Sequence, residues 1–141
     1  MKSVLIDTDI LIKIFRDKKD KTGIRKKMWK IYKEYEEIFI SSITIFEFFK
    51  GEKAIDLDDF IKKRTGLISI IGKFNIKDVE FDRNIAEICA NSWQKMLLNG
   101  VEFEKGKILD FLIGNTAIFK DCYIWTDNTE DFEKIPNLKF I

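Results

Sequence analysis

Four acidic residues in this chain stand inside or directly after apolar runs and not on a solvated face: Asp7, Glu47, Asp110 and Asp127. An ionised carboxylate among Ile, Leu and Phe side chains is costly unless a partner neutralises it, and its pKa rises when none does. Several such groups favour a shared divalent cation. Mg²⁺ needs only one or two carboxylates beside water and phosphate oxygens, so the set predicts metal-assisted hydrolysis at phosphorus.

Each acid also has an ordinary explanation. Asp7 and Asp9 could cap the helix that follows them, and we expect Asp9 to be the cap. Glu47 could face solvent, although its apolar neighbours leave almost no polar arc. Asp110 could simply favour a helix N-terminus, and Asp127 lies in a polar segment typical of a turn. The metal hypothesis therefore depends on the four carboxylates meeting in one place.

The chain contains no histidine. This excludes Ser-His-Asp and Cys-His catalytic arrangements and zinc sites that use histidine. Cys89 and Cys122 lie far apart, each in an apolar pattern, so we expect buried free thiols and no disulfide. Carboxylate chemistry with a hard cation is what remains.

Length and composition indicate one domain spanning residues 1–141. The chain has 141 residues and is 45% hydrophobic, which is enough for a substantial core. Its 25 basic and 24 acidic side chains give a net charge of +1, so any nucleic-acid surface must be local. The first apolar run is too short for a signal peptide, and no run reaches the ~18 residues of a membrane span. We expect a soluble cytoplasmic protein without membrane contact.

Apolar periodicity predicts strands that alternate with helices. We expect strands at residues 3–6, 38–41, 76–81, 122–126 and 138–141, and helices at 9–15, 24–35, 42–51, 57–71, 82–100 and 107–119. Gly72 is the expected stop of the fourth helix, and residues 18–26 form a basic connector. Alternation of this kind is typical of an α/β fold with a mainly parallel sheet covered on both faces.

The predicted elements bring the acids toward one edge of the sheet. Asp7 and Asp127 directly follow predicted strands, and ligands of such sheets bind beyond the carboxyl ends of the strands. Glu47 and Asp110 would approach the same edge from helices. The four carboxylates are thus expected to form one site.

Four segments in order resemble the motifs of PIN-domain ribonucleases, particularly the VapC toxins. They are residues 5–12 (LIDTDILI), 43–51 (ITIFEFFKG), 108–117 (ILDFLIGNTA) and 125–132 (WTDNTEDF). The resemblance spans nearly the whole chain. It implies a three-layer α/β/α sandwich, dependence on Mg²⁺ or Mn²⁺, and hydrolysis of RNA phosphodiester bonds.

The resemblance also assigns roles to residues. Asp7 and Asp110 would be the principal metal ligands, and Glu47 would complete the cluster or orient a bound water. Thr8 and Thr126 occupy positions where the family often has hydroxyl residues that contact the site or the phosphate. The last motif departs from the usual pattern.

In that motif Asn128 takes the slot of an acid or amide and Asp127 takes the variable one. An amide adds no negative charge. We expect Asp127 to be catalytic and Asn128 to bind substrate, and leave open which of the two fills the fourth position of the site and whether one ion or two are held.

The first functional hypothesis is an endoribonuclease toxin, restrained by a cognate antitoxin protein and forming a homodimer. Two alternatives stay open. Asp7-Thr-Asp9 also fits the first motif of haloacid-dehalogenase-like phosphatases, in which the first Asp is a nucleophile. A non-catalytic RNA- or protein-binding module with the same architecture is the other.

RNA contact would require a local basic surface, because neutralisation of phosphates supplies most nonspecific affinity. The densest candidate combines basic side chains with nearby aromatic ones that could stack on bases: Lys18, Lys19, Lys21, Arg25, Lys26, Lys27, Trp29, Tyr32 and Tyr35. The alternative is a solvated connector whose neighbouring tyrosines pack in the core or at a subunit interface.

Overall fold

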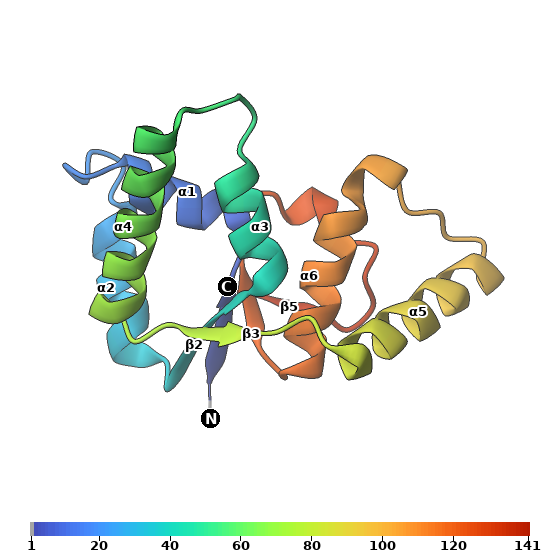
Figure 1. Cartoon of the computed structure of the whole chain (residues 1–141). Helices are drawn as coiled ribbons and strands as arrows, with labels where there is room; N and C mark the ends of the chain where they lie inside the picture. The colour runs from blue at the N-terminus through green and yellow to red at the C-terminus, as the bar shows by residue number, and fades with distance from the viewer. Residues whose placement is uncertain (1) are drawn as a thin grey trace.

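The structure is a computed structural model that describes residues 2–141. Within these residues, five strands are interspersed with six α-helices, mostly two helices between successive strands, and Figure 1 shows how they are arranged. The elements are β1 (Ser3–Ile6), α1 (Thr8–Arg16), α2 (Ile24–Glu34), β2 (Glu37–Ser41), α3 (Ser42–Lys50), α4 (Leu57–Lys73), β3 (Lys77–Val79), α5 (Arg83–Leu98), α6 (Ile108–Phe119), β4 (Tyr123–Trp125) and β5 (Lys139–Phe140), with short 3₁₀ turns η1 (Lys105–Lys107) and η2 (Thr129–Asp131).

All strand pairs are parallel, in the order β3-β2-β1-β4-β5. β1 is central, and its register aligns Leu5 with both Phe39 of β2 and Ile124 of β4. Ile6 is level with Trp125, so the residues after β1 and β4 emerge side by side at the carboxyl edge. The α/β prediction with a parallel sheet is confirmed.

Alternating side chains of β1 enter two separate cores. Val4 and Ile6 pack in one core with residues of α1, α2 and α4, whereas Leu5 packs in the other with residues of α5 and α6. In Figure 1 the first set of helices lies to the left of the sheet and the second to the right. Because successive residues of a strand face opposite sides, this alternation produces the expected three layers.

Several element boundaries differ from the sequence prediction. Asp7, and not Asp9, caps α1: its carboxylate accepts a hydrogen bond from the Thr8 amide. Gly72 does not stop α4, which continues to Lys73, because a single glycine costs only about 1 kcal/mol in a helix that tertiary contacts hold. The third strand is shorter than expected and ends at Val79.

The thiol prediction is confirmed, since Cys89 and Cys122 are free and buried. The apolar side chains of α5 are only partly covered, because Ile88 and Leu97 remain 36% and 48% exposed. Among the described residues 2–141, no helix is long and apolar enough to cross a membrane.

Candidate metal centre

Asp7 lies at the heart of the carboxyl edge, between β1 and α1. Its amide donates to the Trp125 carbonyl at 3.0 Å, which extends the β1–β4 ladder by one step. Asp7 as a whole is 3% exposed. Its carboxylate accepts a hydrogen bond from the Thr8 amide at 2.7 Å and one from the Thr126 hydroxyl at 2.8 Å. The two oxygens are thus oriented by both neighbouring elements.

The environment of Asp7 opposes its negative charge. Its pKa is raised to about 8, mainly by burial and then by the charge and hydrogen bonding of Asp9, while the bonds from Thr126 and Thr8 act in the opposite direction. Two donors therefore do not compensate for the lost water and the neighbouring carboxylate. A cation placed here would remove that penalty.

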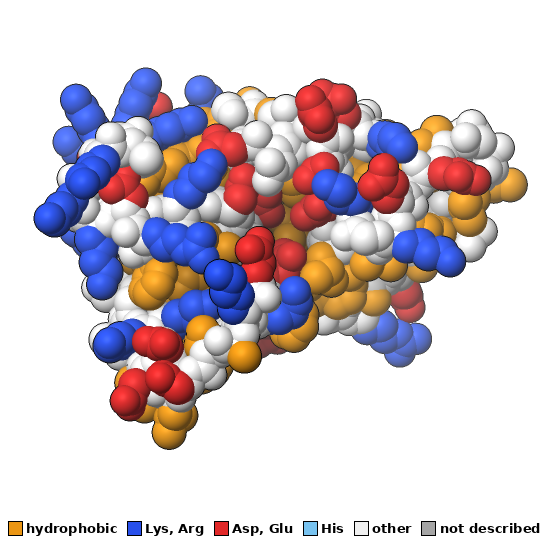
Figure 2. Space-filling view, turned by 90° about the horizontal axis from the view of Figure 1, so that it is seen from above, with side chains coloured by type: hydrophobic (Ala, Val, Ile, Leu, Met, Phe, Trp, Pro, Cys, Tyr) orange, Lys and Arg blue, Asp and Glu red, His pale blue; other side chains and the backbone are white. Residues whose placement is uncertain are grey.

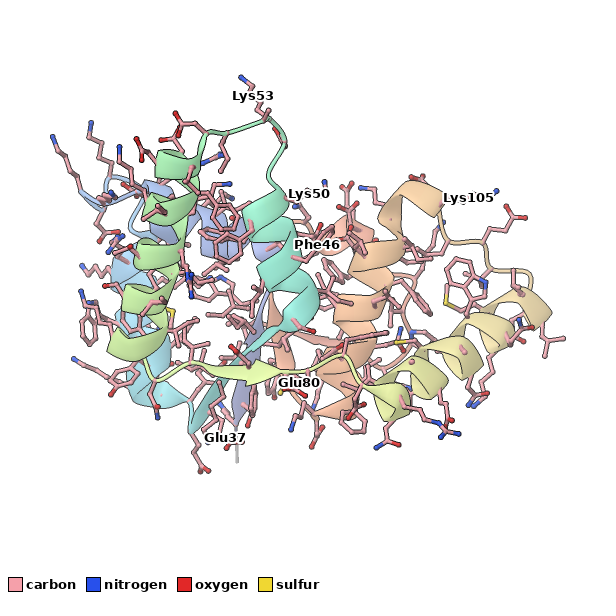
Figure 3. All side chains as sticks on the ribbon, in the orientation of Figure 1. Glu37, Phe46, Lys50, Lys53, Glu80 and Lys105 are labelled. Carbon is pink, nitrogen blue, oxygen red and sulfur yellow. The ribbon has the colours of Figure 1, made fainter. Side chains whose placement is uncertain are left out.

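Glu47 is held by a hydroxyl from the opposite helix. The Thr8 hydroxyl donates to Glu47 Oε1 at 2.7 Å, and the buried Thr44 hydroxyl lies 3.3 Å from the Thr8 hydroxyl. This chain of polar groups ties the first turn of α1 to α3. In Figure 3, Phe46 and Lys50 project from α3 on the side of α6. Glu37, at the start of β2, is labelled at the end of the sheet away from these side chains.

Asp110 enters from the first turn of α6. Burial is the main reason that its pKa rises to about 6, and the charges of Glu47, Asp131 and Asp9 add to the effect while Lys107 reduces it. Lys107 is engaged in an ion pair with Asp131. Asp110 therefore lies within the electrostatic field of carboxylates from α1, α3 and η2.

The segment after β4 is fastened by Asp9. Asp9 Oδ2 accepts from the Asp127 amide and from Asn128 Nδ2, each at 3.1 Å. The Asn128 amide in turn donates to the Thr126 hydroxyl at 3.0 Å. The Asp127 carboxylate is half-exposed and forms an ion pair with Lys13 of α1.

The structure brings most of the predicted site residues together. Direct hydrogen bonds join Asp7 to Thr126 and Thr8 to Glu47, and Asp110 feels the charge of Glu47. Asn128 adjoins the same network through Asp9. Asp127 is close in the chain, but its carboxylate is committed to Lys13.

Sequence reasoning gave too little weight to Asp9 and did not single out Asp131. Both influence the pKa of Asp110. The signal for Asp9 was its place one residue beyond Thr8, on the first turn of a helix that starts at the strand end. No comparable signal marked Asp131, which lies in an acidic turn that resembles ordinary solvated loops.

The donor set fits a hard cation completed by other ligands. Within residues 2–141, no three acidic or cysteine side chains lie close enough to form a finished metal cage. Mg²⁺ does not require one, because it retains waters and takes one or two carboxylates beside substrate phosphates. The raised pKa values of Asp7 and Asp110 come from burial and from neighbouring carboxylates, which is the condition that a bound cation relieves.

Acidic side chains gather near the middle of the face shown in Figure 2, which looks onto the molecule from above. Lys and Arg side chains are most numerous on the left of the same view. The face therefore combines an acidic centre with a basic flank. Together with the sheet, these features define an α/β protein that carries a carboxylate centre at the carboxyl edge of a parallel sheet.

The chain belongs to the PIN domain family, whose pattern matches residues 4–138. It is similar in fold to VapBC2 from Rickettsia felis bound to a promoter DNA fragment, with 19% identity, a TM-score of 0.75, and coverage of 99% of this chain and 97% of the other. FitAcB from Neisseria gonorrhoeae gives 21% identity, a TM-score of 0.75, and coverage of 98% and 96%. For DNA-bound VapBC from Salmonella typhimurium the sequence identity is 21%, the TM-score is 0.72, and the match covers 100% of this chain and 98% of the other. Comparison with curated proteins finds no match.

Proposed function

We propose that this chain is a metal-dependent endoribonuclease of the VapC type and that residues 1–141 act as one nuclease domain. The observation that carries the proposal is the buried Asp7 carboxylate, whose pKa is raised to about 8 in the company of other acids at the carboxyl edge of the sheet. Membership of the PIN family supports hydrolysis of a nucleic-acid backbone over the phosphatase chemistry that Asp7-Thr-Asp9 also suggests.

Asp7 and Asp110 are the residues that would hold Mg²⁺ or Mn²⁺, with Glu47 beside them. Such an ion would polarise the phosphodiester and lower the pKa of a bound water. Thr8 keeps Glu47 in place and Thr126 orients Asp7. Thr8, Thr126 and Asn128 remain the proposed substrate contacts, and Asp127 would contribute directly only after releasing Lys13.

The test is cleavage of a labelled RNA by the purified chain in Mn²⁺ or Mg²⁺. Asp7→Asn and Asp110→Asn should each abolish metal-dependent cleavage while the circular dichroism spectrum stays native, because both replacements remove charge and keep side-chain shape. Asp78→Asn, an exposed position on β3, is the matched control and should cleave like wild type. Wild-type rates in either site variant refute the assignment.

A non-catalytic binding module is the second candidate, favoured by the ion pair that engages the Asp127 carboxylate with Lys13. Mn²⁺ titration separates the two. A ligand that binds only the native state raises its stability by about 2.7 kcal/mol at a hundredfold excess over Kd. A thermal shift lost in Asp7→Asn supports the nuclease, and no shift in wild type supports the module.

We further propose a cognate antitoxin as the protein partner, a homodimer as the assembly and the cytoplasm as the place of action. Two solved structures of similar fold are named as a toxin–antitoxin complex and as a member of a family of toxin–antitoxin systems, which supports the partner. Exposed apolar side chains on α4 and α5, among them Leu57, Ile68 and Leu98, support a subunit or partner interface. Sedimentation equilibrium of the purified chain tests the dimer, and a monomer at micromolar concentration contradicts it.

A further inference from the structure

A hollow of about 560 Å³ adjoins the acidic centre on the exposed side of α1. Asp9 lies on its lining, and the other charged residues that face it are mainly basic: Lys13, Arg16 and Lys21, with Asp17 and Glu52 as the acids. Beyond Asp9 the hollow is thus lined by three cationic and two anionic side chains.

Helical spacing explains why the cations line up with the centre. Asp9 and Lys13 are four residues apart and Lys13 and Arg16 three apart, so all three share one face of α1. At ~1.5 Å per residue, Lys13 lies about 6 Å and Arg16 about 10 Å along the axis from Asp9.

Two of the cations, Arg16 and Lys21, are available to bind an anion. Neither Arg16 nor Lys21 forms an ion pair within residues 2–141. Both are exposed. Lys13, by contrast, is paired with Asp127.

The loop that carries Lys21 is built to hold its position. The Asp17 carboxylate accepts from the Lys21 amide at 2.9 Å and from the Thr22 amide at 2.8 Å. Arg25 donates to the carbonyls of Asp17 and Ile14 at 2.9 and 2.7 Å. Arg25 is thus a structural part of the loop, and the basic cluster predicted for residues 18–27 divides into inward and outward members.

The aromatic part of that predicted cluster is also engaged elsewhere. Trp29 and Tyr32 pack edge-on against Phe74, with ring centroids 4.8 and 6.0 Å away. Tyr35 packs against Tyr123. None of the three lines the hollow beside Asp9, so they do not offer base stacking there.

We propose that this hollow binds the RNA backbone next to the cleaved bond, with Arg16 and Lys21 each contacting a phosphate. The inference rests on the proposed function, because it takes RNA as the substrate. Arg16 presents a planar fork suited to two phosphate oxygens, and Lys21 presents a point charge. The substrate strand leaves the metal centre along α1 toward its carboxyl end.

An acidic protein segment is the rival occupant. The position of Asp9 favours RNA, because Asp9 joins the hollow to the proposed metal centre, and a strand cleaved at that centre must pass this end of the hollow. A nucleic-acid strand reaching the same carboxylates would share their cation. The next residues along α1 then meet the following phosphates.

The experiment uses Arg16→Ala, Lys21→Ala and the double variant of the full chain. Binding of a labelled single-stranded RNA is measured in EDTA, which prevents cleavage, over a series of KCl concentrations. Each substitution should weaken Kd about tenfold at low salt and reduce the slope of log K against log salt by about 0.7. In Mn²⁺, KM should rise while kcat stays within about twofold of wild type.

Lys33→Ala is the matched control, because Lys33 is an exposed lysine in the last turn of α2, outside the hollow. Arg16→Lys keeps the charge and should retain most binding. Wild-type Kd and salt slope in the double variant overturn the proposal. Weaker binding of poly-glutamate with unchanged RNA binding overturns it too and assigns the hollow to an acidic protein segment. Absence of cleavage by wild type refutes the proposed function separately, since the binding assay needs no activity.

Discussion

The stability of the metal-free protein should fall as pH rises, with Asp7 as the main cause and Asp110, whose pKa is raised to about 6, as a smaller one. The pKa of Asp7 is raised from 3.8 to about 8 in the folded chain, first by burial and then by Asp9. A folded state that binds the proton more tightly than the unfolded state is most stable below the unfolded pKa. That stability is lost progressively as pH rises toward the folded pKa.

The size of the effect follows from the interval between the two pKa values. Between about pH 5 and 7 the folded Asp7 retains its proton and the unfolded one does not, so the free energy of unfolding declines by roughly 1.4 kcal/mol per pH unit. For a domain of this size that corresponds to a fall in Tm of about 4 °C per unit. By pH 7 the accumulated cost is about 4 kcal/mol.

Asp7→Asn isolates this contribution because the amide oxygen can still cap α1 while nothing ionises. Thermal unfolding of both proteins is followed in EDTA from pH 4 to 8. The variant should match wild type near pH 4 and exceed it increasingly above pH 5. Asp78→Asn should leave the wild-type curve unchanged. Parallel curves for wild type and Asp7→Asn would refute the reasoning, since they would mean that the Asp7 carboxylate ionises equally well in both states.

Two further predictions concern single contacts. Thr8→Val removes the donor to Glu47 Oε1 and should lower kcat for RNA cleavage about tenfold, the worth of one hydrogen bond to a charged group. Thr8→Ser keeps the hydroxyl and should stay near wild type. Equal rates for the valine and serine variants would contradict a role for the Thr8–Glu47 hydrogen bond. A Cβ at Gly66 would lie 2.4 Å from Phe15, so Gly66→Ala should reduce the urea-derived free energy of unfolding by about 1–3 kcal/mol. In the same helix a Cβ at Gly72 meets no atom within 4 Å, so Gly72→Ala should be neutral or stabilising by up to about 1 kcal/mol. Similar losses of stability in both variants would contradict this explanation by packing.

The sequence was sufficient to place Asp7 because strand and helix patterns meet at that residue. A buried run followed by an amphipathic one locates the carboxyl end of a strand, and parallel neighbours then share an edge. Glu47 could be placed because residues around it are apolar on almost every side of α3. In both cases local patterns determine the position.

Asp9, Asp127 and Asp131 could not be resolved in the same way. Whether Asp7 or Asp9 caps α1 depends on the dihedral angles at one residue, which composition does not determine. Asp127 turns to Lys13, a partner 114 positions away in the chain, and Asp131 gains its influence by facing α6. Such contacts depend on packed geometry and not on local spacing.

Asp7 both starts α1 and faces the carboxylate centre, so reactivity and local folding cannot drift independently at this position. If catalysis were lost during evolution, Asp7→Asn would be a tolerated substitution, because it removes the charge but keeps the first turn of α1 with Thr8 and Asp9. Replacement by Ala would fray that turn as well. Inactive proteins of this fold should therefore have an oxygen-bearing side chain at the position of Asp7 more often than an aliphatic one.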